Sequence, residues 1–106
     1  MITRSRGYAD AMKFAAVFTY PADKERIQQA RPEHRQYLGG LREQGKLAAA
    51  GPFTDDSGAL IVYEAGSKEE AESFLKADPF NQNGIFLKYQ IRPWNTVFAN
   101  RELLPT

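Results

Sequence analysis

The chain has 106 residues, of which 42% are hydrophobic and 25% charged, the composition of one soluble globular domain rather than of a disordered protein. Fourteen basic and thirteen acidic side chains leave a net charge of +1, which excludes the strong charge attraction typical of nucleic-acid and membrane partners. The absence of cysteine excludes disulfides, thiolate catalysis and cysteine-based zinc sites.

The N-terminal residues 1–11 carry two arginines and no apolar segment of the kind that a signal peptide contains. We expect them to form a flexible extension. The apolar run at residues 14–18 is far too short to span a membrane. The sequence therefore predicts a cytoplasmic protein without a membrane partner.

The first strand is predicted at residues 12–20, where Met12, Phe14, Ala16 and Phe18 alternate with the residues between them. Pro21 ends it. The polar segment 21–31 has few apolar positions and is predicted to be a loop or a short exposed helix.

The first helix is predicted to begin at Pro32, because proline is favoured at the first helical position. Tyr37, Leu38 and Leu41 follow at helical spacing, and Gly45 is a typical C-terminal stop. We therefore expect a helix from residue 32 to residue 45.

A hairpin is predicted next. Its first strand, residues 46–53, consists of small residues and ends at Gly51-Pro52. The segment 54–57 supplies turn residues, and residues 58–65 form the second strand.

The second helix begins at a capping box formed by Ser67 and Glu70, and it ends before Pro79. Alternating apolar residues then predict a fourth strand at residues 84–98. Residues 99–106 are predicted to be a loose tail.

The order β-α-β-β-α-β predicts an α+β fold of the ferredoxin-like type across residues 12–98, with a four-stranded antiparallel sheet and both helices on one face. The third strand is apolar on both faces, since Leu60 and Val62 alternate with Ile61 and Tyr63. An open apolar face favours a cover, so we expect a sheet-to-sheet homodimer. Trp94 is the residue expected to reach the partner.

His34, the only histidine, precedes Leu38 and Leu41 by four and seven residues and should lie on the helix stripe that faces the sheet. One interpretation is a half-buried structural histidine that hydrogen-bonds to the backbone. The other is a proton acceptor, since imidazole is the side chain suited to proton transfer near neutral pH.

Asp78 follows Phe74 and Leu75 on the inward stripe of the second helix, at the C-terminal end, where the helix dipole repels anions. One interpretation is an Asx-Pro turn with Pro79. The other is that Asp78 meets His34 between the two helices. The carboxylate would then fix the imidazole tautomer and leave the other nitrogen free to take a proton from a substrate.

Several short segments, taken in their order and spacing, resemble the YciI-like or YCII-related proteins. The family pattern contains RPxH, leucines, a glycine two residues before a leucine, AGP and ADPF, and it extends over nearly the whole span from residue 12 to residue 98. The matching segments are Arg31–His34, Leu38, Leu41, Gly45–Leu47, Ala50–Phe53 and Ala77–Phe80.

The resemblance implies a dimeric α/β barrel of two ferredoxin-like subunits, similar to muconolactone isomerase, with His34 and Asp78 as the active-site pair. A relative dehydrochlorinates a hydroxylated aromatic ring, which implies acid-base chemistry on small cyclic compounds. The resemblance also implies four pocket-lining residues: Arg31, Gly51, Pro52 and Phe80.

Glycines mark two places where a ligand could come close. Leu38-Gly39-Gly40-Leu41 departs from the family, in which bulkier residues are usual here, and the two glycines indicate either a close approach or plain tolerance. Gly51 is interpreted in the same way, with an ordinary strand end as the alternative.

Other types of site find no support in the sequence. One histidine without cysteine does not make a transition-metal site, and the adjacent Asp55 and Asp56 are too local to hold an ion. There is no phosphate-binding glycine motif. The 58–65 strand offers only Tyr63 for base stacking, which argues against RNA.

The sequence therefore predicts a small-molecule enzyme that needs no cofactor and no metal. His34 would act as the proton acceptor, Asp78 would orient it, and the substrate would be a small cyclic or carbonyl compound. The alternative is a non-catalytic ligand-binding or interaction dimer, in which the two residues only fasten two helices together.

Overall fold

The structure, a computed structural model, describes residues 11–104, so the predicted extension 1–11 lies outside the described residues except for Ala11. The helices and strands are, in chain order, β1 (Met12–Thr19), α2 (Lys24–Glu43), β2 (Leu47–Pro52), β3 (Gly58–Ala65), α3 (Lys68–Lys76), α4 (Pro79–Gln82), β4 (Lys88–Trp94) and the 3-10 helix η1 (Arg101–Leu103).

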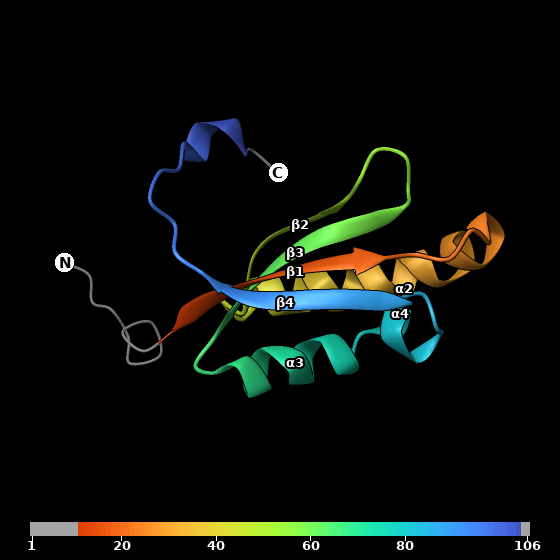
Figure 1. Ribbon diagram of the computed structural model, residues 1–106, viewed down its shortest axis with the longest axis horizontal. Helices are drawn as coiled ribbons and strands as arrows, with labels where there is room; N and C mark the ends of the chain where they lie inside the picture. The colour runs from red at the N-terminus through yellow and green to blue at the C-terminus, as the bar shows by residue number, and fades with distance from the viewer. Residues whose placement is uncertain (1–10, 105–106) are drawn as a thin grey trace.

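The four strands form one antiparallel sheet in the order β2-β3-β1-β4, and α2 and α3 cover one of its faces (Figure 1). Each helix connects two strands that are not neighbours in the sheet, as the β-α-β-β-α-β order requires. The predicted α+β ferredoxin-like fold is confirmed.

Alternation along the strands separates a buried face from an open one. In β1, Phe14, Ala16 and Phe18 are at most 2% exposed and pack under the helices, whereas Val17 between them is 47% exposed. In β3, Ile61 is buried and its neighbour Leu60 is 41% exposed. The core therefore lies between the sheet and the helices, and the opposite face carries exposed apolar side chains.

Helix α2 is longer than predicted, because it begins at Lys24 rather than at Pro32. Asp23 caps its N-terminus, and Ile27 and Ala30 extend the buried stripe that continues to His34. Pro32 lies inside the helix. Proline removes one backbone hydrogen bond, and the helix tolerates this here because Pro32 is exposed to solvent.

The end of α2 agrees with the prediction. Gly45 has a φ of 76°, the left-handed conformation that glycine adopts without strain. Its N–H bonds to the Arg42 carbonyl at 3.0 Å, and the N–H of Lys46 bonds to the Leu41 carbonyl at 2.8 Å. These bonds end the helix and direct the chain into β2.

Strand β4 is shorter than predicted, because it covers Lys88–Trp94 and not the whole of residues 84–98. Gly84 turns the chain with a φ of 72°, and the N–H of Ile85 bonds to the Phe80 carbonyl. Ile85 and Phe86 are both buried, which an alternating strand does not allow with one face in water. They belong to the core beside α4.

The described part of the predicted tail, residues 99–104, contains the short helix η1. Residues 105–106 lie outside the described part. Within residues 11–104 no helix is long and apolar enough to cross a membrane.

Candidate active site

His34 lies on the inward side of α2 and is 6% exposed. Its Nδ1 atom lies 2.7 Å from Oδ1 of Asp78, which is fully buried. The two residues are 44 positions apart in the chain. The fold thus brings together the histidine and the aspartate that the sequence analysis paired.

Asp78 directly follows Ala77, the C-cap of α3, and its N–H bonds to the Leu75 carbonyl at 3.2 Å, as its predicted place at the end of this helix requires. A short further helix that was not predicted begins at the same residue. Asp78 lies between α3 and α4 as the N-cap of α4, where Oδ1 accepts a 2.8 Å hydrogen bond from the Phe80 N–H. A carboxylate is stabilised at a helix N-terminus, which opposes the repulsion expected from the C-terminal end of α3. The same oxygen therefore forms both the Asx-type turn and the contact with His34, and the two interpretations of Asp78 hold together.

The second carboxylate oxygen, Oδ2, is fully buried and has no hydrogen-bond partner among the described residues. The Tyr63 hydroxyl is in the same situation. Burial, and then the Asp78 charge, raise the pKa of Tyr63, so this hydroxyl stays protonated. All hydrogen bonds of the carboxylate are thus made by Oδ1.

Aromatic rings hold the imidazole in place. The Phe80 ring stacks on the His34 ring with centroids 3.8 Å apart and planes inclined by 3°, and Phe86 meets it edge-on at 6.1 Å. With Nδ1 bonded to Asp78, the ring keeps one orientation. Nε2 hydrogen-bonds to no residue in the range 11–104 and is the nitrogen available to a ligand.

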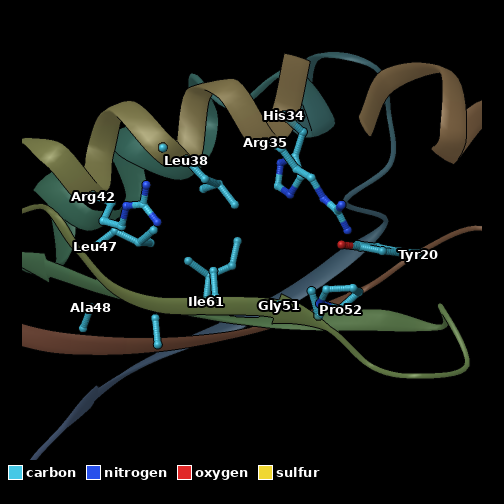
Figure 2. A pocket seen from close by; sticks show the side chains of 14 residues that line it. Tyr20, His34, Arg35, Leu38, Arg42, Leu47, Ala48, Gly51, Pro52 and Ile61 are labelled. Atoms are coloured by element: carbon cyan, nitrogen blue, oxygen red, sulfur yellow. The ribbon is translucent and has the colours of Figure 1, made fainter. Parts of the chain in front are cut away.

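A cavity of about 590 Å³ lies beside His34, between α2 and strand β2 (Figure 2). Most of its wall is apolar. The residues that line it are Tyr20, His34, Arg35, Leu38, Gly39, Arg42, Leu47, Ala48, Ala49, Ala50, Gly51, Pro52, Ala59 and Ile61. Its size suits a small organic molecule.

Of the four predicted binding residues, Gly51 and Pro52 line this cavity. Phe80 lies behind the imidazole and is fully buried. Arg31 donates from Nη2 to Oδ1 of Asp56 at 2.8 Å, in an ion pair that holds α2 to the β2–β3 turn. Within the described chain neither Phe80 nor Arg31 lines the cavity, so a binding role for them stays a prediction.

The sequence analysis missed three polar residues of the cavity wall: Tyr20, Arg35 and Arg42. The two arginines lie three residues before and four residues after Leu38, which places them on the stripe that was identified only by its apolar members. Burial raises the pKa of Tyr20 to about 12, so its hydroxyl is protonated at neutral pH and can donate a hydrogen bond.

No other part of the described chain lies close to the two glycines of α2. A Cβ atom built on Gly39 or Gly40 meets nothing within 4 Å. Gly39 lines the cavity, whereas Gly40 does not. The space at Gly39 therefore belongs to the cavity.

Among the described residues no group of three or more histidine, cysteine, aspartate or glutamate side chains is arranged to hold a metal ion.

Comparison with known proteins places the chain in a family. The YCII-related domain matches residues 12–95. Protein YciI from Escherichia coli and from Shigella flexneri is 30% identical over 93 residues, which covers 74% of this chain and 95% of the relative. A solved structure of 5-chloro-2-hydroxyhydroquinone dehydrochlorinase from Burkholderia phenoliruptrix, in complex with 2,5-dihydroxybenzoquinone, superposes with a TM-score of 0.70 at 26% identity. That match covers 79% of this chain and 94% of the other. The chain belongs to the family of YCII-related domain proteins.

Proposed function

We propose that the protein is an enzyme that transfers protons on a small cyclic or carbonyl compound, with His34 as the base and Asp78 as its positioning residue. The observation that carries this proposal is the 2.7 Å contact between Nδ1 and Oδ1 at the wall of the cavity. A buried histidine that is oriented by a carboxylate and borders a cavity is the arrangement that general-base catalysis needs.

The mechanism follows from the hydrogen bond. A carboxylate only accepts hydrogen bonds, so Nδ1 of the neutral imidazole carries the proton and its N–H donates a hydrogen bond to Oδ1 of Asp78. Nε2 then has a free lone pair toward the cavity. When Nε2 takes a proton from the substrate, the ring becomes positively charged, and the Asp78 carboxylate stabilises that charge at hydrogen-bond distance.

The structural neighbour suggests the class of reaction. Dehydrochlorination is the loss of one proton and one chloride ion. The ring would first take its keto form, in which a hydroxyl proton has moved to the carbon that carries the chlorine. In this chain Nε2 of His34 would then accept a proton from a second hydroxyl group, whose electron pair would form a carbonyl group while a ring double bond shifts, and chloride would leave with the electrons of its bond to carbon. The step balances without an oxidant or a cofactor. The 590 Å³ cavity, with its apolar walls, has room for a substituted six-membered ring.

The second candidate is a ligand-binding dimer without catalysis. It is favoured by the burial of both residues, 6% exposed for His34 and 0% for Asp78, because a buried hydrogen bond also fastens α2 to α4. The two candidates differ in what Nε2 does. Only the enzyme needs that atom.

The proposal is tested with the chlorinated compound of the neighbour. Purified protein is incubated with 5-chloro-2-hydroxyhydroquinone, and released chloride is measured against a protein-free sample. We expect catalysed release that saturates with substrate. If the compound binds and no chloride is released above the protein-free rate, dehydrochlorination is not the reaction.

The cavity also predicts the effect of filling it. In Gly39→Leu the Cβ atom meets nothing of the described chain within 4 Å and the side chain occupies cavity space, so we expect a lower affinity for 2,5-dihydroxybenzoquinone in calorimetry. The helix itself should gain about 0.5–1 kcal/mol in unfolding free energy, because leucine is a better helix former than glycine. Gly40→Leu is the matched control, since it makes the same change on the same helix outside the cavity. Equal affinities of the two variants would contradict this placement of the ligand.

We further propose that the open face of the sheet is covered by a second copy of the chain. Val17, Leu60 and Trp94 are 47%, 41% and 47% exposed there, on the face of the sheet opposite the helices. In sedimentation analysis the protein should have twice the mass of one chain. Leu60→Asp places a charge on this face and should yield single chains, whereas Gln29→Asp, on exposed α2 surface, should not. A wild-type protein that sediments as a single chain would contradict the dimer.

A further inference from the structure

Among the described residues, the cavity beside His34 is lined by basic side chains and by no acidic ones. Its lining residues include Arg35 and Arg42 but no aspartate or glutamate. The arginines are seven residues apart, about two helical turns, so both project from the same side of α2. Figure 2 shows both side chains extending from α2 into the space above β2.

Neither arginine is neutralised by the described chain. Within residues 11–104, Arg35 and Arg42 form no ion pair, whereas Arg31 pairs with Asp56. Asp78, the acidic residue next to the cavity, lies behind the imidazole and is bonded to it. Two unpaired cations that share one cavity create a positive potential there, which favours an anion.

Tyr20 adds a neutral donor to this charge. Its side chain lines the cavity, and its hydroxyl forms no hydrogen bond with another described residue. Because burial keeps this hydroxyl protonated, it can donate to an oxyanion at neutral pH. Among the charges that act on Tyr20, Arg31 and then Arg35 lower its pKa, whereas Asp56 and Asp78 raise it, and burial outweighs all four.

Between the charged groups the wall is apolar. Leu38 lies between the arginines on α2, and Leu47 and Ile61 form part of the wall opposite. Gly39 leaves the space in front of this wall open. An occupant therefore needs an apolar body as well as a charged group.

We propose that the cavity binds an organic anion, a flat ring that carries an enolate, phenolate or carboxylate oxygen, with Arg35 and Arg42 supplying the charge and Tyr20 a hydrogen bond. The proposal rests on the proposed function in one respect, because it names the substrate class of the same cavity. Guanidinium groups are suited to delocalised oxyanions, since their N–H donors lie in one plane. They would also stabilise the negative charge that grows on a substrate when His34 removes its proton.

Arg42 has a simpler use, because it lies in the last turn of α2 and stabilises the negative end of the helix dipole. That use predicts an effect on folding alone. Ligand binding decides between the two, since a structural arginine does not distinguish charged from neutral ligands.

The test compares two rings by isothermal titration calorimetry at neutral pH. 2,5-Dihydroxybenzoquinone is anionic, because its hydroxyl groups are vinylogous carboxylic acids, and 2,5-dimethoxybenzoquinone is a neutral analogue. We expect the wild type to bind the anion about tenfold more tightly than the neutral ring, a modest ratio because both arginines are also exposed to solvent. Arg35→Gln/Arg42→Gln should remove this preference, and added salt should weaken it.

The matched control is Lys68→Gln/Lys76→Gln, which removes two positive charges from exposed positions of α3 and should keep the preference. A double arginine variant that still prefers the anion, or a control that loses the preference equally, would overturn the anion site. The outcome is independent of catalysis: His34→Asn keeps both arginines and should still prefer the anion. If the preference is found and no chloride is released, the proposed reaction fails and the anion site remains.

Discussion

His34→Asn should lower kcat for chloride release from 5-chloro-2-hydroxyhydroquinone about a hundredfold to ten-thousandfold, the usual contribution of a general base. The asparagine amide nitrogen is as many bonds from Cα as Nδ1 of histidine, so it can still donate to Oδ1 of Asp78. What the variant lacks is Nε2. The substitution thus removes the proposed base and keeps the hydrogen bond.

His34→Gln provides the matched comparison. Its longer side chain places an amide near the former Nε2 and withdraws the donor from Asp78, which leaves the buried carboxylate with only the Phe80 N–H. We expect His34→Gln to be less stable than His34→Asn by about 1–3 kcal/mol in urea unfolding, and equally inactive. A His34→Asn enzyme whose kcat is within tenfold of the wild type would refute His34 as the base.

Asp78→Ala should lower the free energy of unfolding by about 2–4 kcal/mol, which is the sum of a buried hydrogen bond to His34 and the N-cap of α4. Both bonds end on the same oxygen, so one substitution removes both. Urea unfolding monitored by circular dichroism measures the effect. A variant as stable as the wild type would show that Asp78 does not fasten α4 to α2.

Asp78→Asn separates fold from chemistry. The amide oxygen can take the place of Oδ1 and accept both hydrogen bonds, while the negative charge is lost. We expect a smaller loss of stability than in Asp78→Ala, and a kcat reduced more than KM, because the charge matters most when the imidazole is protonated. An Asp78→Asn variant with a kcat close to that of the wild type would indicate a purely structural aspartate.

The strand pattern made much of the fold predictable. Alternation gave β3 its correct bounds, Gly58–Ala65, and glycine and proline marked the turns around β2. The order of elements then fixed the sheet topology, which in turn brought His34 and Asp78 to the same side of the sheet. Sequence-distant residues can be paired in this way when each lies on an inward stripe of its own helix.

The errors have physical causes. Pro32 was interpreted as a helix start, because its effect inside a helix is usually large, and the buried stripe at Ile27 and Ala30 was overlooked. Asp78 follows the end of α3, as predicted, but the short helix α4 that it also begins was not predicted. Proline prefers the first position of a helix. Pro32 lies inside α2 despite this preference, because tertiary packing extends the helix before it, whereas Pro79 satisfies the preference at the start of α4.

The cavity wall was harder to predict. Arg35 and Arg42 resemble ordinary solvent-facing residues of an amphipathic helix, and only the position of β2 shows that they border a cavity. Arg31, by contrast, was expected in the pocket and is paired with Asp56. Which of several arginines on one helix contacts a ligand depends on the opposite wall, and a helical repeat does not contain that information.

The central claim is that Nδ1 of His34 donates to Asp78 and that Nε2 faces the ligand. Since the chain has one histidine, nitrogen NMR of the imidazole gives a single pair of ring signals. The account predicts that the neutral ring carries its proton on Nδ1, and that 2,5-dihydroxybenzoquinone shifts the Nε2 signal most. A proton on Nε2 in the neutral ring, or no shift at saturating quinone, would contradict it.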